Sequence, residues 1–171
     1  MTLIYTALLS EAQYLIEKLK LKLEQKNPKI YKNKDIILSV GGIGKKNTIK
    51  TLTIIYEKQK ISKAINIGIA GCSDKNISIG ELFCTNRKLK NINYINLETV
   101  DSPQLLTLNS SPLTLYDMEA SYFQEISSRY LNQEDIFIFK VVSDHLDNKI
   151  PSKEFVKQLI KNSMKSWERW I

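Results

Sequence analysis

Cysteine and arginine are scarce in this chain of 171 residues, and each scarcity excludes a class of protein. The only cysteines, Cys72 and Cys84, are too few for a disulfide scaffold and lack the clustered spacing of a zinc site. Only three arginines occur, Arg87, Arg129 and Arg169, so the formal net charge of +7 comes from scattered lysines. Nucleic-acid sites favour arginine with interleaved aromatic residues, so this charge does not indicate a nucleic-acid partner.

Long apolar runs are also missing. No window approaches the ~18 consecutive apolar residues of a membrane span, and the N-terminal MTLIYTALLSEAQ lacks the basic region and the cleavage site of a signal peptide. No cluster of metal-ligating residues occurs, so we expect neither a metal nor another cofactor. Since 43% of the residues are hydrophobic, we expect one domain over residues 1–171 with a real core, in a cytoplasmic protein.

Short apolar runs alternate with helical patterns along the chain. Strands are expected at residues 3–9, 35–40, 64–69, 82–84, 92–100 and 136–142, and helices from Ser10 to about Leu23, over 46–59, over 118–130 and from Pro151 onward. Polar residues 24–34 follow the first helix, and residues 102–112 are rich in loop-forming types. This alternation predicts a three-layer α/β fold, with a mostly parallel mixed central sheet flanked by helices.

Acidic residues and glycines follow these strands at their carboxyl ends. Ligands bind beyond the carboxyl ends of the strands in sheets of this kind, so these residues are expected to share one pocket. They are Glu11 after the first strand, Gly41 to Gly44 after the second, Gly68 to Gly71 at the third, Ser143 and Asp144 after the last, and Glu119 at the start of the preceding helix.

These segments, in this order, resemble the nucleoside phosphorylase superfamily, and most closely the methylthioadenosine/S-adenosylhomocysteine nucleosidases. Each motif alone is common, but all of them stand in the family's order at matching strand or helix ends. The segments are Ala7-Leu-Leu-Ser-Glu11, Gly42-Ile-Gly-Lys45, Asn66-Ile-Gly-Ile-Ala-Gly71, Met118-Glu119-Ala120 and Val142-Ser143-Asp144. The stretch between Gly80 and Met118 is shorter than in the family, so the chain resembles a member shortened in its middle.

The resemblance implies hydrolysis of the N-glycosidic bond of a purine nucleoside by a homodimer. It implies that Asp144 protonates the leaving purine, and that Glu11 and Glu119 position the attacking water. Glu119 is also implied to hold a ribose hydroxyl. The expected substrate-binding residues are Met118, Ser143, Ile69, Ala70, Gly71 and Asp101.

Elementary chemistry supports these roles. A purine anion leaves poorly, so cleavage needs protonation of a ring nitrogen, and a positioned acid contributes ~10²–10⁴-fold. Asp144 must then hold a proton near neutral pH, against an ordinary pKa of ~3.9, which requires desolvation or a nearby carboxylate. The sugar acquires oxocarbenium character as the bond breaks, and the negative charges of Glu11 and Glu119 stabilise it.

Other interpretations stay open. A phosphate-dependent nucleoside phosphorylase would need arginine to hold phosphate, and none occurs before Arg87. A non-catalytic nucleoside-binding relative would keep the pocket without turnover, as the short middle favours. Glu11 and Glu119 also suit the first turn of a helix, and Asp144 suits a turn cap.

Overall fold

The computed structural model describes residues 1–102, 113–147 and 150–171. The strands are β1 (Thr2–Thr6), β2 (Lys22–Lys26), β3 (Lys29–Lys32), β4 (Ile36–Val40), β5 (Lys63–Cys72), β6 (Leu82–Cys84), β7 (Asn93–Tyr94), β8 (Asn96–Thr99), β9 (Thr114–Asp117) and β10 (Ile136–Asp144). The helices are α1 (Leu9–Lys18), α2 (Lys45–Lys58), α3 (Ala120–Ser127) and α4 (Lys153–Trp167), with short 3₁₀ helices η1 (Gln133–Asp135) and η2 (Glu168–Trp170).

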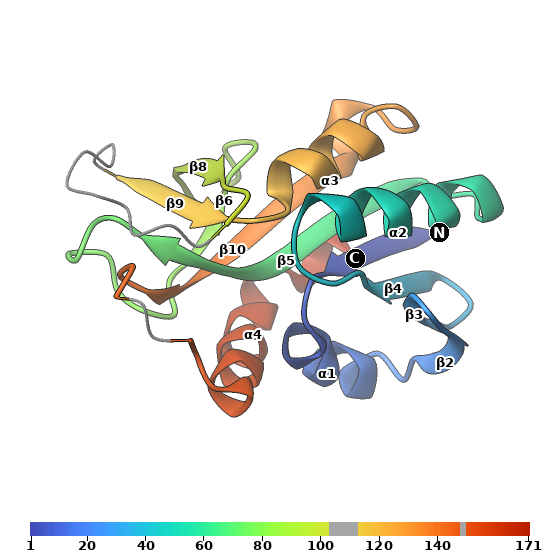
Figure 1. The fold of residues 1–171 in the computed structure, drawn as a ribbon, viewed down its shortest axis with the longest axis horizontal. Helices are drawn as coiled ribbons and strands as arrows, with labels where there is room; N and C mark the ends of the chain where they lie inside the picture. The colour runs from blue at the N-terminus through green and yellow to red at the C-terminus, as the bar shows by residue number, and fades with distance from the viewer. Residues whose placement is uncertain (103–112, 148–149) are drawn as a thin grey trace.

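The strands of the described residues form one mixed sheet (Figure 1). Its order is β2-β3-β4-β1-β5-β10-β6-β7, while β9 pairs with β5 and β8 pairs with β9. The central strands β4, β1, β5 and β10 are parallel, whereas β2, β3 and β6 join the sheet antiparallel. Helices α2 and α3 cover one face and α1 and α4 the other (Figure 1). The predicted three-layer α/β fold is therefore confirmed.

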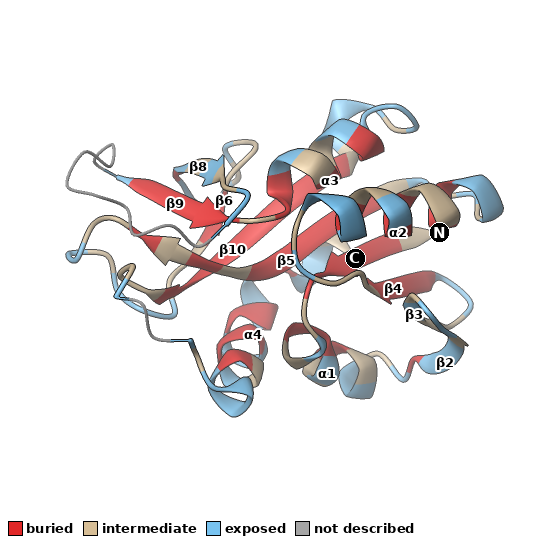
Figure 2. Ribbon diagram, viewed as in Figure 1, coloured by how far each residue is buried: buried red, intermediate tan, exposed pale blue. Residues whose placement is uncertain are grey.

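The central strands are the most buried part of the molecule, as the red ribbon in Figure 2 shows. Every residue from Ile136 to Ser143 is buried, because helices cover both faces of β10. Trp167, in the helix expected from Pro151 onward, lies in the same core cluster as Phe139 and packs against it with ring centroids 5.8 Å apart. The strand expected at residues 136–142 is confirmed as the buried strand β10.

The region after the first helix differs from the prediction. Helix α1 ends at Lys18, and residues 22–32 form the β2–β3 hairpin, which pairs with β4. Leu23, placed on the helix by its spacing, is instead half exposed on a strand. Tertiary pairing with the edge of the sheet outweighs the weak helical pattern here.

The middle of the chain also differs. The strand expected over 92–100 is split into β7 and β8, and β9 was not predicted. The helix expected from Met118 begins at Ala120. Of the loop-rich passage 102–112, all but Ser102 lies outside the described residues.

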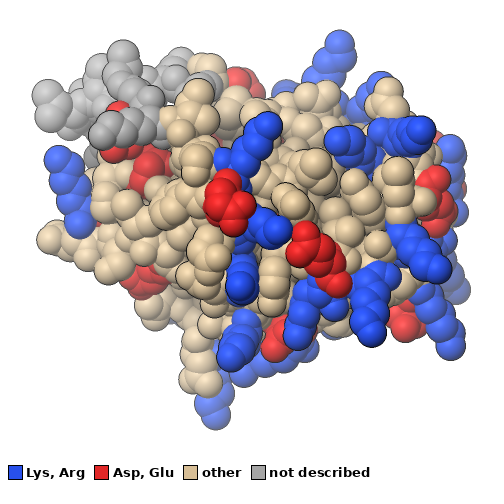
Figure 3. Space-filling model, turned by 90° about the horizontal axis from the view of Figure 1, so that it is seen from below, with Lys and Arg blue, Asp and Glu red and all other residues tan. Residues whose placement is uncertain are grey.

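The charged side chains are unevenly spread on the face shown in Figure 3. Lysines and arginines gather from the middle to the right of the view, with acidic side chains between them, while the left part is mostly uncharged. Within the described part of the chain, no helix is long and apolar enough to cross a membrane.

Candidate active site

A cavity of about 470 Å³ opens at the carboxyl ends of the central strands. Glu11, Glu119 and Asp144, far apart in the sequence, all line it. The expected substrate-binding residues that line it as well are Ile69, Ala70, Gly71, Met118 and Ser143. The structure therefore brings together eight of the nine residues singled out from the sequence.

Asp101 is the exception. Its side chain is exposed, and its Oδ1 accepts a hydrogen bond of 2.6 Å from the hydroxyl of Tyr122 on α3. The neighbouring Val100 lines the cavity in its place. The sequence could not separate the two, because which of two adjacent side chains faces a pocket depends on the path of the chain after β8.

Glu11 is held by main-chain N–H groups. Its Oε2 accepts from Ala7 N at 3.0 Å and Leu8 N at 2.8 Å, and its Oε1 accepts from Ile69 N at 3.0 Å. Leu8 is the N-cap of α1, so the carboxylate also lies where the helix dipole favours negative charge. Burial nevertheless raises the pKa of Glu11, opposed by the hydrogen bond from Leu8 and by the charge of Lys140.

Glu119 lies at the start of another helix. Its Oε1 accepts from Gly44 N at 2.8 Å, at the N-cap of α2. Gly44 has φ of 85°, a conformation that side-chain-bearing residues rarely adopt, so the glycine turn positions this donor. Burial raises the pKa of Glu119 to about 7, the charge of Lys140 and the Gly44 hydrogen bond acting against it.

Asp144 lies at the end of β10, where the register with β5 shifts after Val142. Its Oδ2 accepts from Ser143 Oγ at 2.6 Å, and its Oδ1 accepts from Leu146 N at 2.9 Å. Ser143 Oγ also lies 3.3 Å from the carbonyl oxygen of Ala70, which it can reach as a donor. The turn contact agrees with the capping interpretation, but the half-buried carboxyl also faces the cavity.

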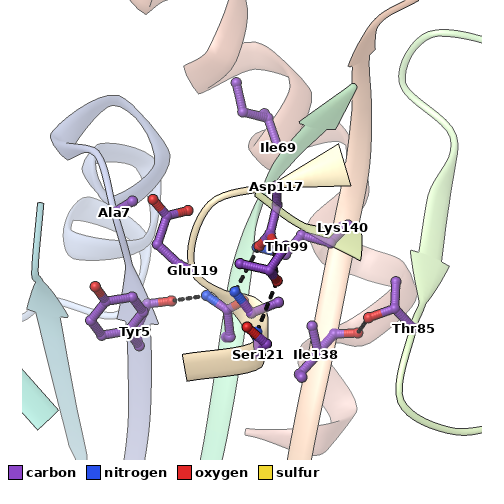
Figure 4. Close-up of polar contacts among 12 residues, drawn as sticks. Tyr5, Ala7, Ile69, Thr85, Thr99, Asp117, Glu119, Ser121, Ile138 and Lys140 are labelled. Atoms are coloured by element: carbon purple, nitrogen blue, oxygen red, sulfur yellow. Dashed lines mark hydrogen bonds and ion pairs between the residues drawn. The ribbon is translucent and has the colours of Figure 1, made fainter. Parts of the chain in front are cut away.

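Three residues of the site were missed in the sequence. Lys140, 1% exposed, places its Nζ 2.7 Å from Oδ2 of Asp117, and Asp117 Oδ1 accepts from Thr99 Oγ1 at 2.7 Å (Figure 4). A lysine inside an otherwise apolar strand is rarely buried without a partner, and this was the available signal. The partner could not be named because Asp117 belongs to the unpredicted β9.

The charged side chains in the described wall of the cavity are all acidic. Four carboxyl groups line it, those of Glu11, Asp117, Glu119 and Asp144, and no lysine, arginine or histidine is among its described lining residues. The remaining wall is largely apolar, with Leu8, Ile43 and Leu146 among its side chains. Such a wall suits a neutral ligand that develops positive charge and disfavours a bound phosphate. No group of three or more metal-ligating side chains is assembled among the residues that the structure describes.

The fold is that of solved nucleosidase structures, which superpose on nearly the whole chain. The nucleoside phosphorylase-like fold expected from the motifs is thus confirmed. The methylthioadenosine/S-adenosylhomocysteine nucleosidase of Streptococcus pneumoniae, solved with 8-aminoadenine, superposes with a TM-score of 0.79 at 15% identity, over 99% of this chain and 97% of its own. Futalosine hydrolase of Helicobacter pylori superposes with a TM-score of 0.77 at 14% identity, over 99% and 96%.

Sequence similarity is more local. A segment of 54 residues is 37% identical to the 5'-methylthioadenosine/S-adenosylhomocysteine nucleosidase of Staphylococcus haemolyticus, covering 32% of this chain and 24% of that protein. The match thus spans about a quarter of the length of the curated relative. No family model matches the chain. The resemblance drawn from the motifs is therefore supported by named relatives as well as by the fold.

Proposed function

We propose that this protein is a purine nucleosidase that hydrolyses the N-glycosidic bond of a nucleoside such as methylthioadenosine or S-adenosylhomocysteine. The observation that carries the proposal is the convergence of Glu11, Glu119 and Asp144 on one cavity. The partial identity to a nucleosidase and the superposition on one that holds 8-aminoadenine favour a purine nucleoside as substrate.

In the proposed reaction, Asp144 gives a proton to the leaving base. Ser143 suits this role in both protonation states of the acid. Its hydroxyl can accept a hydrogen bond from protonated Asp144 while it donates one to the Ala70 carbonyl, and it can donate a hydrogen bond to the carboxylate once the proton has gone to the base. The acid therefore keeps a hydrogen-bond partner throughout the step.

Glu11 and Glu119 act on the sugar side. Their carboxylates stabilise the positive charge that develops on the ribose, and they orient the water that attacks it. Glu119 also binds a ribose hydroxyl. Since both groups are held by backbone donors before any substrate arrives, little reorganisation is needed at the moment of reaction.

Adenine release from methylthioadenosine and from S-adenosylhomocysteine, followed by chromatography, tests the activity directly. Futalosine belongs in the same assay, because a futalosine hydrolase superposes nearly as closely, with a TM-score of 0.77 against 0.79. If the protein binds these nucleosides but releases no base from any of them, the non-catalytic interpretation replaces the proposal.

Hydrolysis is expected to be independent of phosphate. With no cationic side chain among the described lining residues, nothing there pairs with a phosphate dianion. We expect the rate of base release to change by less than about twofold between phosphate-free buffer and saturating phosphate, with free sugar as the only sugar product. A sugar phosphate as product, or a strict phosphate requirement, would assign the reaction to the phosphorylases.

Gly68→Ala is expected to lower the rate of base release about 10-fold or more. A Cβ at this position would lie 2.8 Å from Oε1 of Glu11, so the carboxylate would have to leave its bond to Ile69 N. Circular dichroism checks that the fold survives. Gly80→Ala, where the nearest atom to such a Cβ is 3.6 Å away, is the control for adding a methyl group without a steric clash, although its φ of 90° adds some strain.

The predicted homodimer and cytoplasmic location stay predictions. The cavity rim gives the first some support, because Ile43 and Ile150 are 50% and 96% exposed there, and Leu9 and Phe155 are also exposed. A second copy of the chain could cover these apolar side chains.

A further inference from the structure

The buried charges behind Glu11 and Glu119 form a connected set. Asp117 is 6% exposed and binds three donors from three elements: Thr99 Oγ1 on β8 at 2.7 Å, Ala120 N on α3 at 2.9 Å, and Lys140 Nζ on β10 at 2.7 Å. Thr99 Oγ1 in turn accepts from Ser121 N at 3.0 Å, so its single proton is directed at Asp117 (Figure 4). The carboxylate is therefore fixed in place.

Lys140 has its position fixed by this carboxylate. The ideal Cβ position at Gly68 lies 3.5 Å from Lys140 Nζ and 2.8 Å from Glu11 Oε1, so the ammonium and the carboxylate meet over the same glycine. Lys140 does not line the cavity, whereas both glutamates do. The lysine thus lies behind the carboxylates and leaves their cavity side open to a ligand.

We propose that the Asp117–Lys140 ion pair is a positioning element, a proposal that rests on the proposed function. Asp117 is held by its hydrogen bonds from Thr99 and Ala120. It fixes the buried ammonium of Lys140 where the positive charge balances the carboxylates of Glu11 and Glu119. Neither residue of the pair need touch the reacting atoms. The pair acts through the two glutamates, on which the sugar side of the reaction depends.

The electrostatics agree with this geometry. Burial acts to lower the pKa of Lys140, but Asp117 and then Glu119 outweigh it, so its pKa is raised and it stays charged. Burial raises the pKa of Glu119, and Lys140 is the strongest influence in the opposite direction. The titratable groups that face Glu119 are Lys140 on β10, Asp117 on β9, Glu11 on α1 and Tyr5 on β1. Of these, only Lys140 carries positive charge.

The test is a titration that does not depend on turnover. In protein labelled at the glutamate carboxyl carbons, the midpoint of Glu119 near pH 7 is expected to rise by at least about one pH unit in Lys140→Met. Lys140→Arg keeps the charge and is expected to stay within about half a unit of the wild type. Lys157→Met, which removes a surface partner of Glu17, is the matched control and leaves the midpoint unchanged.

Activity gives the second readout. In Lys140→Met, the acidic limb of the plot of kcat/KM against pH is expected to shift to higher pH, by about as much as the titration midpoint of Glu119. A wild-type midpoint in Lys140→Met, or a midpoint in Lys140→Arg as high as in Lys140→Met, overturns the proposal even if the protein is an active nucleosidase. Conversely, absence of nucleosidase activity leaves the titration able to test the pair.

A buried unpaired Asp117 could prevent Lys140→Met from folding. The double variant Asp117→Asn/Lys140→Met removes both charges together and avoids this. Because Lys140 influences Glu119 more strongly than Asp117 does, the midpoint is still expected to rise, though less than in the single variant. An unchanged or lowered midpoint in the double variant counts against the proposal.

Discussion

Asp144→Asn is expected to lower kcat for base release by about 10²–10⁴-fold while leaving nucleoside binding within a few-fold. The amide keeps an oxygen that can accept from Leu146 N, so the turn after β10 is preserved. It has no acidic proton to give to the purine. Single-turnover assays of base release, together with calorimetric titration of the nucleoside, separate the loss of chemistry from a loss of binding.

The control for this variant is Asp147→Asn, in the same turn but exposed, for which wild-type kinetics are expected. Base release by Asp144→Asn at more than about a tenth of the wild-type rate would remove Asp144 from the role of general acid. Equal loss of binding and of turnover would instead assign it a purely structural role as a turn cap.

Glu119→Gln is expected to reduce base release by about 10²-fold and, at the same time, to stabilise the fold at alkaline pH. Burial raises the pKa of Glu119 to about 7 from 4.5, so the folded protein holds its proton more tightly than the unfolded chain does. Ionising Glu119 in the folded state therefore lowers the free energy of unfolding by about 3 kcal/mol at most. This destabilisation is fully present above pH 7 and absent below pH 4.5.

The sign of the pH dependence follows from this. As pH rises from 4.5 to 7, Glu119 makes the wild type progressively less stable, and the glutamine variant lacks this loss. Urea unfolding at pH 8 is expected to show the variant more stable by on the order of 1–3 kcal/mol, with no difference at pH 4. Glu125→Gln, which alters an exposed pair with Arg129, changes stability by less than about 1 kcal/mol. A variant less stable than the wild type at pH 8 would contradict the raised pKa.

The parallel centre of the sheet could be predicted because its strands have the apolar sequences expected of strands that are covered by helices on both faces. Residues 136–142 are apolar on both sides of the strand apart from Lys140, and the helices on either face supply the cover. The cavity followed from the same logic, since glycines and carboxylates at the strand ends must meet at one edge of a parallel sheet.

The edges of the sheet could not be predicted in this way. Strand β2 is almost wholly exposed and pairs with β3, which in turn pairs with β4, and these edge contacts leave little trace in the sequence of Lys22 to Lys26. Asp117 and Thr99 were missed for a related reason: β8 and β9 are short, and their functional contacts come from pairing Thr99 with Asp117 across the ladder. A buried lysine indicates that it has an acidic partner, but only the fold shows which residue that partner is.

The main-chain amides that hold Glu11 and Glu119 have a consequence for sequence drift. The donors come from Ala7, Leu8, Ile69 and Gly44, and an amide hydrogen is present whichever side chain a residue carries, with proline as the one exception. The side chains of Ala7, Leu8 and Ile69 can therefore change without removing a donor, whereas Gly44 and Gly68 are held by conformation and by space. Substitution by proline at Ala7 or Ile69 is the kind of change that this arrangement cannot absorb.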